Sequence, residues 1–112
     1  MKYLCYTLGD ESAAIPAPPN PEMMARMEAF VQDALDRGLL LATGGVGPLA
    51  ESFRVIYVDG GVEVTDGPFA EAKELVGGWA LIDVPSRAEA VDLATRFLRI
   101  AGGGSSTIRP VV

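Results

Sequence analysis

The 112-residue sequence contains no histidine, and this absence removes several kinds of active site. A serine–histidine–aspartate triad needs an imidazole as its general base. Metal centres that depend on imidazole nitrogen ligands are excluded for the same reason. Carboxylates are therefore the first candidates for acid–base chemistry in this chain.

Cysteine, basic residues and long apolar runs are also scarce. The single cysteine, Cys5, can form neither an intrachain disulfide nor a zinc cage, and its apolar neighbours predict a buried side chain. Lysine and arginine number nine against fifteen acids, a net charge of −6 without a basic cluster, which argues against binding nucleic acid. No apolar run reaches the ~20 residues that span a bilayer, and Asp10 and Glu11 follow too soon for a signal peptide. We therefore expect a cytoplasmic protein that does not bind membranes.

The composition is that of a globular chain. Apolar residues make up 49% of the sequence and charged residues 21%, and the length is typical of one domain. We expect residues 1–112 to form a single domain.

The first half of the chain predicts a strand, a helix and a second strand. Lys2–Leu8 is an apolar, aromatic run typical of a buried strand, and a proline-rich loop follows it. Asn20 and Pro21 form a helix start, and Arg37 with Gly38 form a helix end. The helix between them carries an apolar stripe at a spacing of three and four residues, with Met23, Phe30 and Ala34 beside it; the stripe comprises Met24, Met27, Val31 and Leu35. The apolar run Leu39–Thr43 predicts the next buried strand.

The second half predicts a hairpin, a strand, a helix and a last strand. Phe53–Val58 and Val62–Thr65 flank a turn at Asp59-Gly60-Gly61, and their weak alternation predicts one wet face. Trp79–Val84 is a further apolar strand. Ser86-Arg87-Ala88-Glu89 is a capping box that starts a second amphipathic helix, and Thr107–Val112 forms a short final strand.

This order predicts an α+β fold, a ferredoxin-like βαββαβ sandwich with an inserted β-hairpin. Two helices with one apolar stripe each must share one face of so small a sheet. The other face would then be lined by apolar side chains, either Tyr3, Cys5, Trp79 and Leu81 or the alternate set Leu4, Tyr6, Ala80 and Ile82. A face this apolar is unfavourable in water, and pairing with an identical chain would cover it. We expect a homodimer.

The stretch VTDGPFAEAKELVGGWALIDVPS, residues 64–86, resembles the DGPF branch of the YCII-related proteins, named for its Asp-Gly-Pro-Phe tetrapeptide. The MKYLCYTLGDE start, the RGLLLATGG region and the IRPV ending extend the resemblance over almost the whole chain. It implies a dimeric α+β barrel, in which two ferredoxin-like sheets pack face to face. Other YCII-like proteins use a His–Asp pair for proton transfer on small ring compounds, but this chain has no histidine to supply it. The resemblance also implies a regulatory setting linked to sigma factors.

Asp66, the first residue of the tetrapeptide, is the leading candidate for chemistry. One interpretation makes it a turn aspartate, with Gly67 supplying unusual dihedral angles and Pro68 opening a short helical turn. The other places its carboxylate in a cleft as a general base or ligand anchor, where partial burial would raise its pKa. The resemblance supports the second interpretation, because the family's motif aspartate lies beside its pocket.

Cationic side chains supply candidate contacts to an anionic ligand. Lys73 would pair with Asp66 or hold the ligand, and its alternative is a solvated helical face. Arg54 and Arg109 would each clamp a carboxylate, or else form ordinary ion pairs.

Aromatic side chains are the remaining ligand candidates. Tyr6 and Trp79 are either stacking platforms or aromatics of the core and dimer interface, and Phe69 adds the ring of the tetrapeptide. Glu71 and Glu74 share a face but bring too few ligands for a divalent cation. The glycine-rich GGVGP and GGGSS segments lack the lysine of a phosphate loop. We therefore expect no metal and no cofactor.

These residues leave two functional hypotheses. The first is a homodimeric protein that binds a small molecule or a protein partner, in a setting linked to sigma factors, without established catalysis. The alternative is a lyase or isomerase that uses Asp66 as general acid or base, with Lys73 or an arginine stabilising the developing anion. If Asp66 lies in a partly apolar pocket beside a cation, the enzyme gains support.

Overall fold

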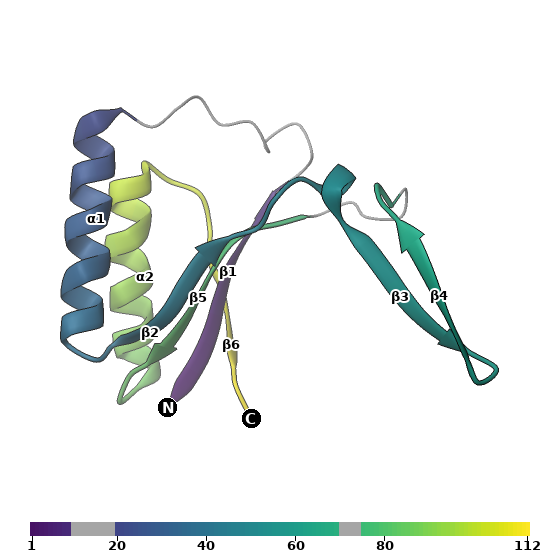
Figure 1. Cartoon of the computed structure of the whole chain (residues 1–112). Helices are drawn as coiled ribbons and strands as arrows, with labels where there is room; N and C mark the ends of the chain where they lie inside the picture. The colour runs from purple at the N-terminus through teal and green to yellow at the C-terminus, as the bar shows by residue number, and fades with distance from the viewer. Residues whose placement is uncertain (10–19, 70–74) are drawn as a thin grey trace.

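The protein is described by a computed structural model covering residues 1–9, 20–69 and 75–112. Within these ranges the structure has two α-helices, six strands and a short 3-10 helix (Figure 1). In chain order the elements are β1 (Lys2–Gly9), α1 (Pro21–Asp36), β2 (Leu40–Gly45), η2 (Leu49–Glu51), β3 (Phe53–Val58), β4 (Gly61–Asp66), β5 (Leu75–Asp83), α2 (Arg87–Ala101) and β6 (Thr107–Pro110).

Four of the strands form one antiparallel sheet in the order β2-β5-β1-β6. Both helices lie against the same face of this sheet (Figure 1). This arrangement confirms the ferredoxin-like α+β fold, with the β3–β4 hairpin inserted between β2 and β5. The predicted elements are confirmed with shifted ends: β5 begins at Leu75 rather than Trp79, and β6 ends at Pro110. The proline-rich loop falls outside the described residues.

The register of the central strands decides which side chains form the core. In β1 and β5, Tyr3 lies opposite Ile82 and Cys5 lies opposite Ala80. Tyr3 and Ile82 are buried in the core cluster, and Cys5 and Ala80 pack against it. Because neighbours opposite each other share a face, the other face carries Leu4, Tyr6, Trp79 and Leu81. We call these four residues the bare sheet face.

Both sets offered by the sequence for the uncovered face are therefore wrong in their pairing. Each set combined one strand's core side with the other strand's outer side. Side chains alternate within each strand, so the sequence gives two sets per strand. Only the cross-strand register joins the correct sets, and a slip of one residue exchanges them.

The first helix is rotated from the predicted position of its stripe. Ala34 is fully buried, and Phe30 and Val31 pack against the core. Met24 and Leu35, which were expected in the stripe, are 56% and 41% exposed. Ala34 of α1 and Ala90 of α2 both belong to the core, so small residues of both helices meet there. This long-range packing sets the rotation of α1.

The β3–β4 hairpin stands away from the helix–sheet body as a separate two-stranded sheet (Figure 1); we call it the arm. Its turn is shorter than predicted, because Asp59 and Gly60 form it with φ angles of 49° and 77° while Gly61 belongs to β4. Two central residues with positive φ match the right-handed twist of hairpin strands.

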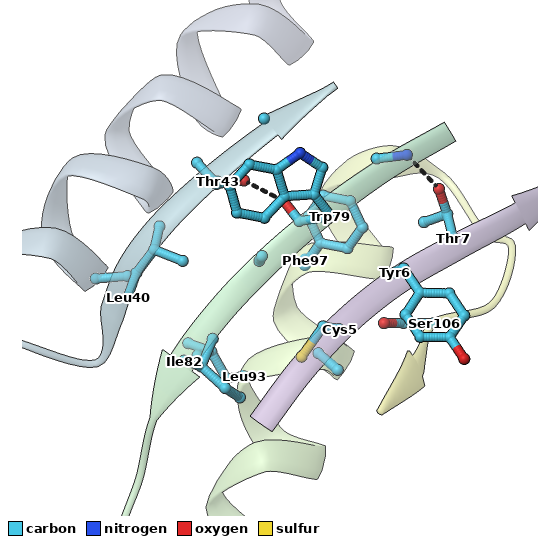
Figure 2. Close-up of a pocket in the computed structure, with 15 residues that line it drawn as sticks. Cys5, Tyr6, Thr7, Leu40, Thr43, Trp79, Ile82, Leu93, Phe97 and Ser106 are labelled. Carbon is cyan, nitrogen blue, oxygen red and sulfur yellow. Dashed lines mark hydrogen bonds between the residues drawn. The ribbon is translucent and has the colours of Figure 1, made fainter. Parts of the chain in front are cut away.

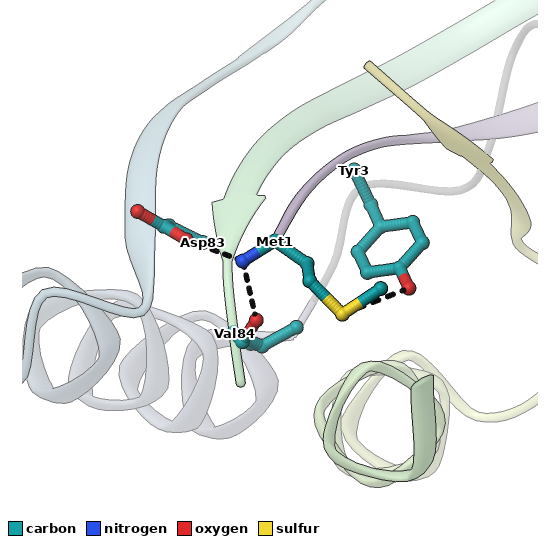
Figure 3. A network of polar contacts seen from close by, with 4 residues as sticks. All are labelled: Met1, Tyr3, Asp83 and Val84. Carbon is teal, nitrogen blue, oxygen red and sulfur yellow. Dashed lines mark hydrogen bonds and ion pairs between the residues drawn. The ribbon is translucent and has the colours of Figure 1, made fainter. Parts of the chain in front are cut away.

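The start of β1 is joined to the end of β5 by polar contacts (Figure 3). The amino group of Met1 donates to the Val84 carbonyl oxygen at 2.9 Å and lies 3.2 Å from a carboxylate oxygen of Asp83. The Tyr3 hydroxyl lies 3.9 Å from the Met1 sulfur. The ion pair is solvent-exposed and contributes little by itself, so the backbone pairing of β1 carries most of this junction.

Both helices begin at the residues that the sequence indicated. The Asn20 side chain accepts a hydrogen bond from the Met23 amide at 2.7 Å, and Ser86 accepts one from the Glu89 amide at 3.3 Å. Each bond satisfies an amide at a helix start that has no partner within the helix.

We expect Asn20→Ala to lower the free energy of unfolding by about 1 kcal/mol, because the first turn of α1 loses its cap. Urea unfolding followed by circular dichroism measures the change. Asn20→Asp is the matched control and retains the wild-type midpoint, since aspartate caps equally well. Equal midpoints for wild type and Asn20→Ala would contradict the prediction.

Candidate functional site

A pocket of about 220 Å³ lies between the sheet and the helices, at the end of the sheet where β1, β2 and β5 approach α2 (Figure 2). The helices contribute mainly apolar side chains, and the strands contribute both backbone and side chains. The described residues that line it are Cys5, Tyr6, Thr7, Ala34, Leu40, Thr43, Gly44, Gly78, Trp79, Ala80, Ile82, Leu93, Ala94, Phe97 and Ser106. None of these residues is charged.

Besides Tyr6, three lining residues carry a hydroxyl group: Thr7, Thr43 and Ser106. The Thr43 hydroxyl donates a hydrogen bond to the Trp79 carbonyl oxygen at 2.8 Å, and the Thr7 hydroxyl accepts one from the Gly78 amide at 2.9 Å (Figure 2). Thr7 thus keeps its own hydroxyl hydrogen for another acceptor. Ser106 makes no side-chain hydrogen bond to the part of the chain that the structure describes. The hydroxyls of Thr7 and Ser106 are the groups that can orient a ligand.

Cys5 places a half-buried thiol in the pocket wall. Burial raises the pKa of this thiol above its ordinary value of 9.0, because the thiolate loses solvation. The thiol is therefore neutral at physiological pH and behaves as an apolar wall group rather than a nucleophile.

Tyr6 and Trp79 are among the lining residues, but the strand register places their side chains on the bare sheet face. Trp79 is the protein's one tryptophan, and its indole lies over the backbone of Gly44 on the neighbouring strand. A Cβ atom added at Gly44 would stand only 3.1 Å from the indole nitrogen. The glycine thus leaves the space that the ring occupies.

Asp66 lies outside this pocket, at the end of β4. Its side chain is exposed, and it has no hydrogen-bond or ion-pair partner among residues 1–9, 20–69 and 75–112. The neighbouring Gly67 donates its amide to the Ser52 carbonyl at 2.7 Å, and the Gly67–Pro68 peptide bond is cis. A Cβ atom at Gly67 would overlap the Leu49 carbonyl oxygen and the Ser52 hydroxyl. The tetrapeptide thus closes the base of the arm against η2.

Phe69 and Arg54 also meet at this base. The Arg54 guanidinium lies 4.0 Å from the centre of the Phe69 ring, a cation–π contact between β3 and the tetrapeptide. Arg109 is exposed on β6, opposite Leu4. Neither arginine lines the pocket. Lys73, Glu71 and Glu74 fall outside the described residues.

Of the site residues predicted from the sequence, Tyr6 and Trp79 are among the lining residues, whereas Thr7, Thr43, Ser106 and Phe97 were not predicted. These four residues come from four separate segments, and no local motif connects them. Within the described ranges, no group of three or more cysteine or acidic side chains is placed to hold a metal ion. No described helix is long and apolar enough to cross a membrane.

Comparison with known proteins identifies the family to which this fold belongs. A family model for the YCII-related domain matches residues 1–112. The chain belongs to the YCII-related family. It is also similar to the uncharacterized protein R00369 of Rhizobium meliloti (strain 1021), with 32% identity over 110 residues, which cover 96% of this chain and 88% of that protein. The family assignment agrees with the α+β fold.

We expect Gly67→Ala to lower the free energy of unfolding by about 1–3 kcal/mol, because the added methyl group overlaps backbone and hydroxyl oxygens at the base of the arm. Asp66→Asn, one residue away, changes it by less than about 0.5 kcal/mol, since the carboxylate is exposed. Urea unfolding compares the two. A larger loss for Asp66→Asn than for Gly67→Ala would contradict the assigned role of the tetrapeptide.

We expect the alkylation rate of Cys5 by iodoacetamide to rise with pH around a midpoint above 9.0, because the folded thiol ionises later than a solvated one. The same shift has a consequence for stability. Since the unfolded thiol has the lower pKa, the folded state keeps its full stability below about pH 9 and loses some as pH rises further. Mass spectrometry of the alkylated protein measures the rate. A midpoint at or below 9.0 would show that the thiol is solvated.

Proposed function

We propose that this protein binds a small, uncharged, mainly apolar molecule in the pocket between the sheet and α2, and that it does so as a cytoplasmic homodimer of the DGPF branch. The observation that supports this proposal is the pocket itself. It combines an apolar lining with two hydroxyls that have hydrogen-bonding capacity left, and no described residue of its wall is charged.

The size of the pocket supports a ligand with one ring. A cavity of about 150 Å³ lined by aliphatic and aromatic side chains holds benzene, whereas sites for drug-sized molecules measure about 300–1,000 Å³. At about 220 Å³ this pocket suits a single substituted ring. Phe97 and Leu93 of α2 offer apolar contacts to such a ring, and Ser106 offers a hydrogen bond to one substituent.

The absence of charge in the described lining argues against an anionic ligand. A carboxylate placed there would lose its hydration without gaining a cation. Arg54 and Arg109 lie elsewhere, so the predicted carboxylate clamp finds no support in the pocket. The lyase or isomerase hypothesis also lacks support there, because Asp66 is exposed and outside the wall. A role of Asp66 in catalysis stays a prediction.

The homodimer is supported by the bare sheet face. Leu4 on this face is 38% exposed, and Tyr6, Trp79 and Leu81 are half-buried within the described chain. The described helices lie on the opposite face (Figure 1). Burial of apolar surface is favourable at about 25 cal/mol per Å², and a second copy offers an identical apolar face. A protein partner linked to sigma factors stays an expectation from the family resemblance.

We expect benzyl alcohol and toluene to cause saturable NMR shifts of the Gly78 and Ala80 amides, because both residues line the pocket. Benzyl alcohol binds more tightly, because its hydroxyl pairs with Ser106, and Ser106→Ala removes this preference. Ala94→Phe places a ring inside the pocket and weakens both ligands at least about tenfold.

Ala88→Phe is the matched control, since Ala88 is an exposed alanine of the same helix outside the pocket. It leaves both affinities unchanged. The proposal fails if neither compound gives saturable shifts in the wild type, or if Ala94→Phe binds both as the wild type does.

A further inference from the structure

The two faces of the arm differ in polarity, as the strand register shows. Val55 lies opposite Val64, and Tyr57 lies opposite Val62. With Phe53 these residues form the apolar part of one face, which we call the arm's apolar face, and Asp66, opposite Phe53, ends this face at the base. The opposite face carries Arg54, Glu63 and Thr65 together with Ile56 and Val58. The sequence predicted this weak alternation, with one solvent-exposed face that carries Arg54, Glu63 and Thr65.

No core covers the arm's apolar face within the described chain. The exposed fractions of its side chains are 68% for Phe53, 59% for Val55, 75% for Tyr57, 63% for Val62 and 64% for Val64. The largest apolar patch of a typical monomer measures about 300–600 Å² and is often functional. Five large apolar side chains on one face of a hairpin form such a patch.

The arm also receives little support from its own protomer. The described contacts to it lie at its base, where Gly67 bonds to Ser52 and Arg54 stacks on Phe69. Beyond the base it projects away from the helices and the main sheet (Figure 1). A two-stranded hairpin alone is marginally stable in water, so the apolar face needs a covering surface.

The dimensions of the whole chain indicate how much surface needs covering. Its radius of gyration is 16.4 Å, whereas a compact chain of this length has about 13 Å. It exposes 8075 Å², whereas a compact monomer of 11.8 kDa exposes about 5,900 Å². A standard interface covers about 800 Å² on each partner, and obligate homodimers cover more. The exposed surface in excess of a compact monomer is therefore similar in area to the surface that each protomer of an obligate homodimer buries.

We propose that the arms are exchanged between two copies of this chain, so that the arm's apolar face of each protomer packs against the body of the other. The inference rests on the homodimer proposed above and adds its main contact. Each chain carries two uncovered apolar surfaces, the bare sheet face and the arm's apolar face. A two-fold axis presents both surfaces of each protomer to the other at once. An anionic lipid surface fits less well, because the chain has a net charge of −6.

The test compares the full-length wild type with the double variant Val55→Glu/Val64→Lys. These positions lie opposite each other, so the new charges attract across the strands and keep the hairpin paired. They make the proposed contact costly, because two charges would be buried in it. Thr65→Lys, on the polar face, is the matched control. Sedimentation equilibrium gives the dimer dissociation constant, and hydrogen exchange reports protection of the β3 and β4 amides.

We expect a wild-type dimer whose arm amides are protected, and the same for Thr65→Lys. In the double variant the dissociation constant rises at least about 30-fold, and the arm amides exchange as in a free hairpin. Binding of benzyl alcohol to the monomer persists, which separates this inference from the ligand proposal. If the double variant fails to fold, Tyr57→Lys near the tip replaces it, and we expect the same rise in the dissociation constant and the same loss of amide protection.

Two results would overturn the arm exchange and distinguish its failure from that of the homodimer. If the wild type is a monomer at micromolar concentration, both the homodimer and the exchange are wrong. If the double variant and Tyr57→Lys both fold and dimerise like the wild type, the homodimer stands without the arms.

Discussion

The pairing of β1 with both of its neighbours is the constraint on which the rest of this structure depends. β1 lies between β5 and β6, and Cys5 stands opposite Ala80 on one side and Ile108 on the other. All three side chains pack against the core. This register directs one face of the sheet to the helices and leaves Leu4 and Trp79 on the other. The pocket and the bare sheet face both follow from it.

The pocket arises where the core ends. Ala34 and Ala90 of the helices belong to the core, and Phe97, Thr7 and Thr43 line the pocket beside it. The threonines are partly used in joining strands, since Thr43 bonds to β5 and Thr7 to Gly78. The wall of the pocket is thus also a part of the sheet's own hydrogen bonding, which fixes the positions of Thr7 and Thr43.

The most recognisable part of the sequence serves the architecture of the chain. Asp66 ends β4 in solvent, Gly67 fits against η2, and Phe69 supports Arg54. The tetrapeptide holds the base of an arm whose apolar face the protomer leaves exposed. A conspicuous motif here marks the junction of two substructures, while the pocket is built from inconspicuous alanines, threonines and a serine. Family membership agrees with this fold without naming a reaction.

The sequence by itself determined the features that depend on near neighbours along the chain. Asn20 and Ser86 start the helices, Asp59 and Gly60 turn the hairpin, and the missing histidine excludes imidazole chemistry. These depend on hydrogen bonds and dihedral angles within a few residues. Only the tertiary structure decided which side of each strand is buried, how α1 is rotated, and that Thr7 and Ser106 share a pocket. The physical reason is that strand register and helix rotation come from contacts between distant segments, and alternation within a strand is the same for both choices of face.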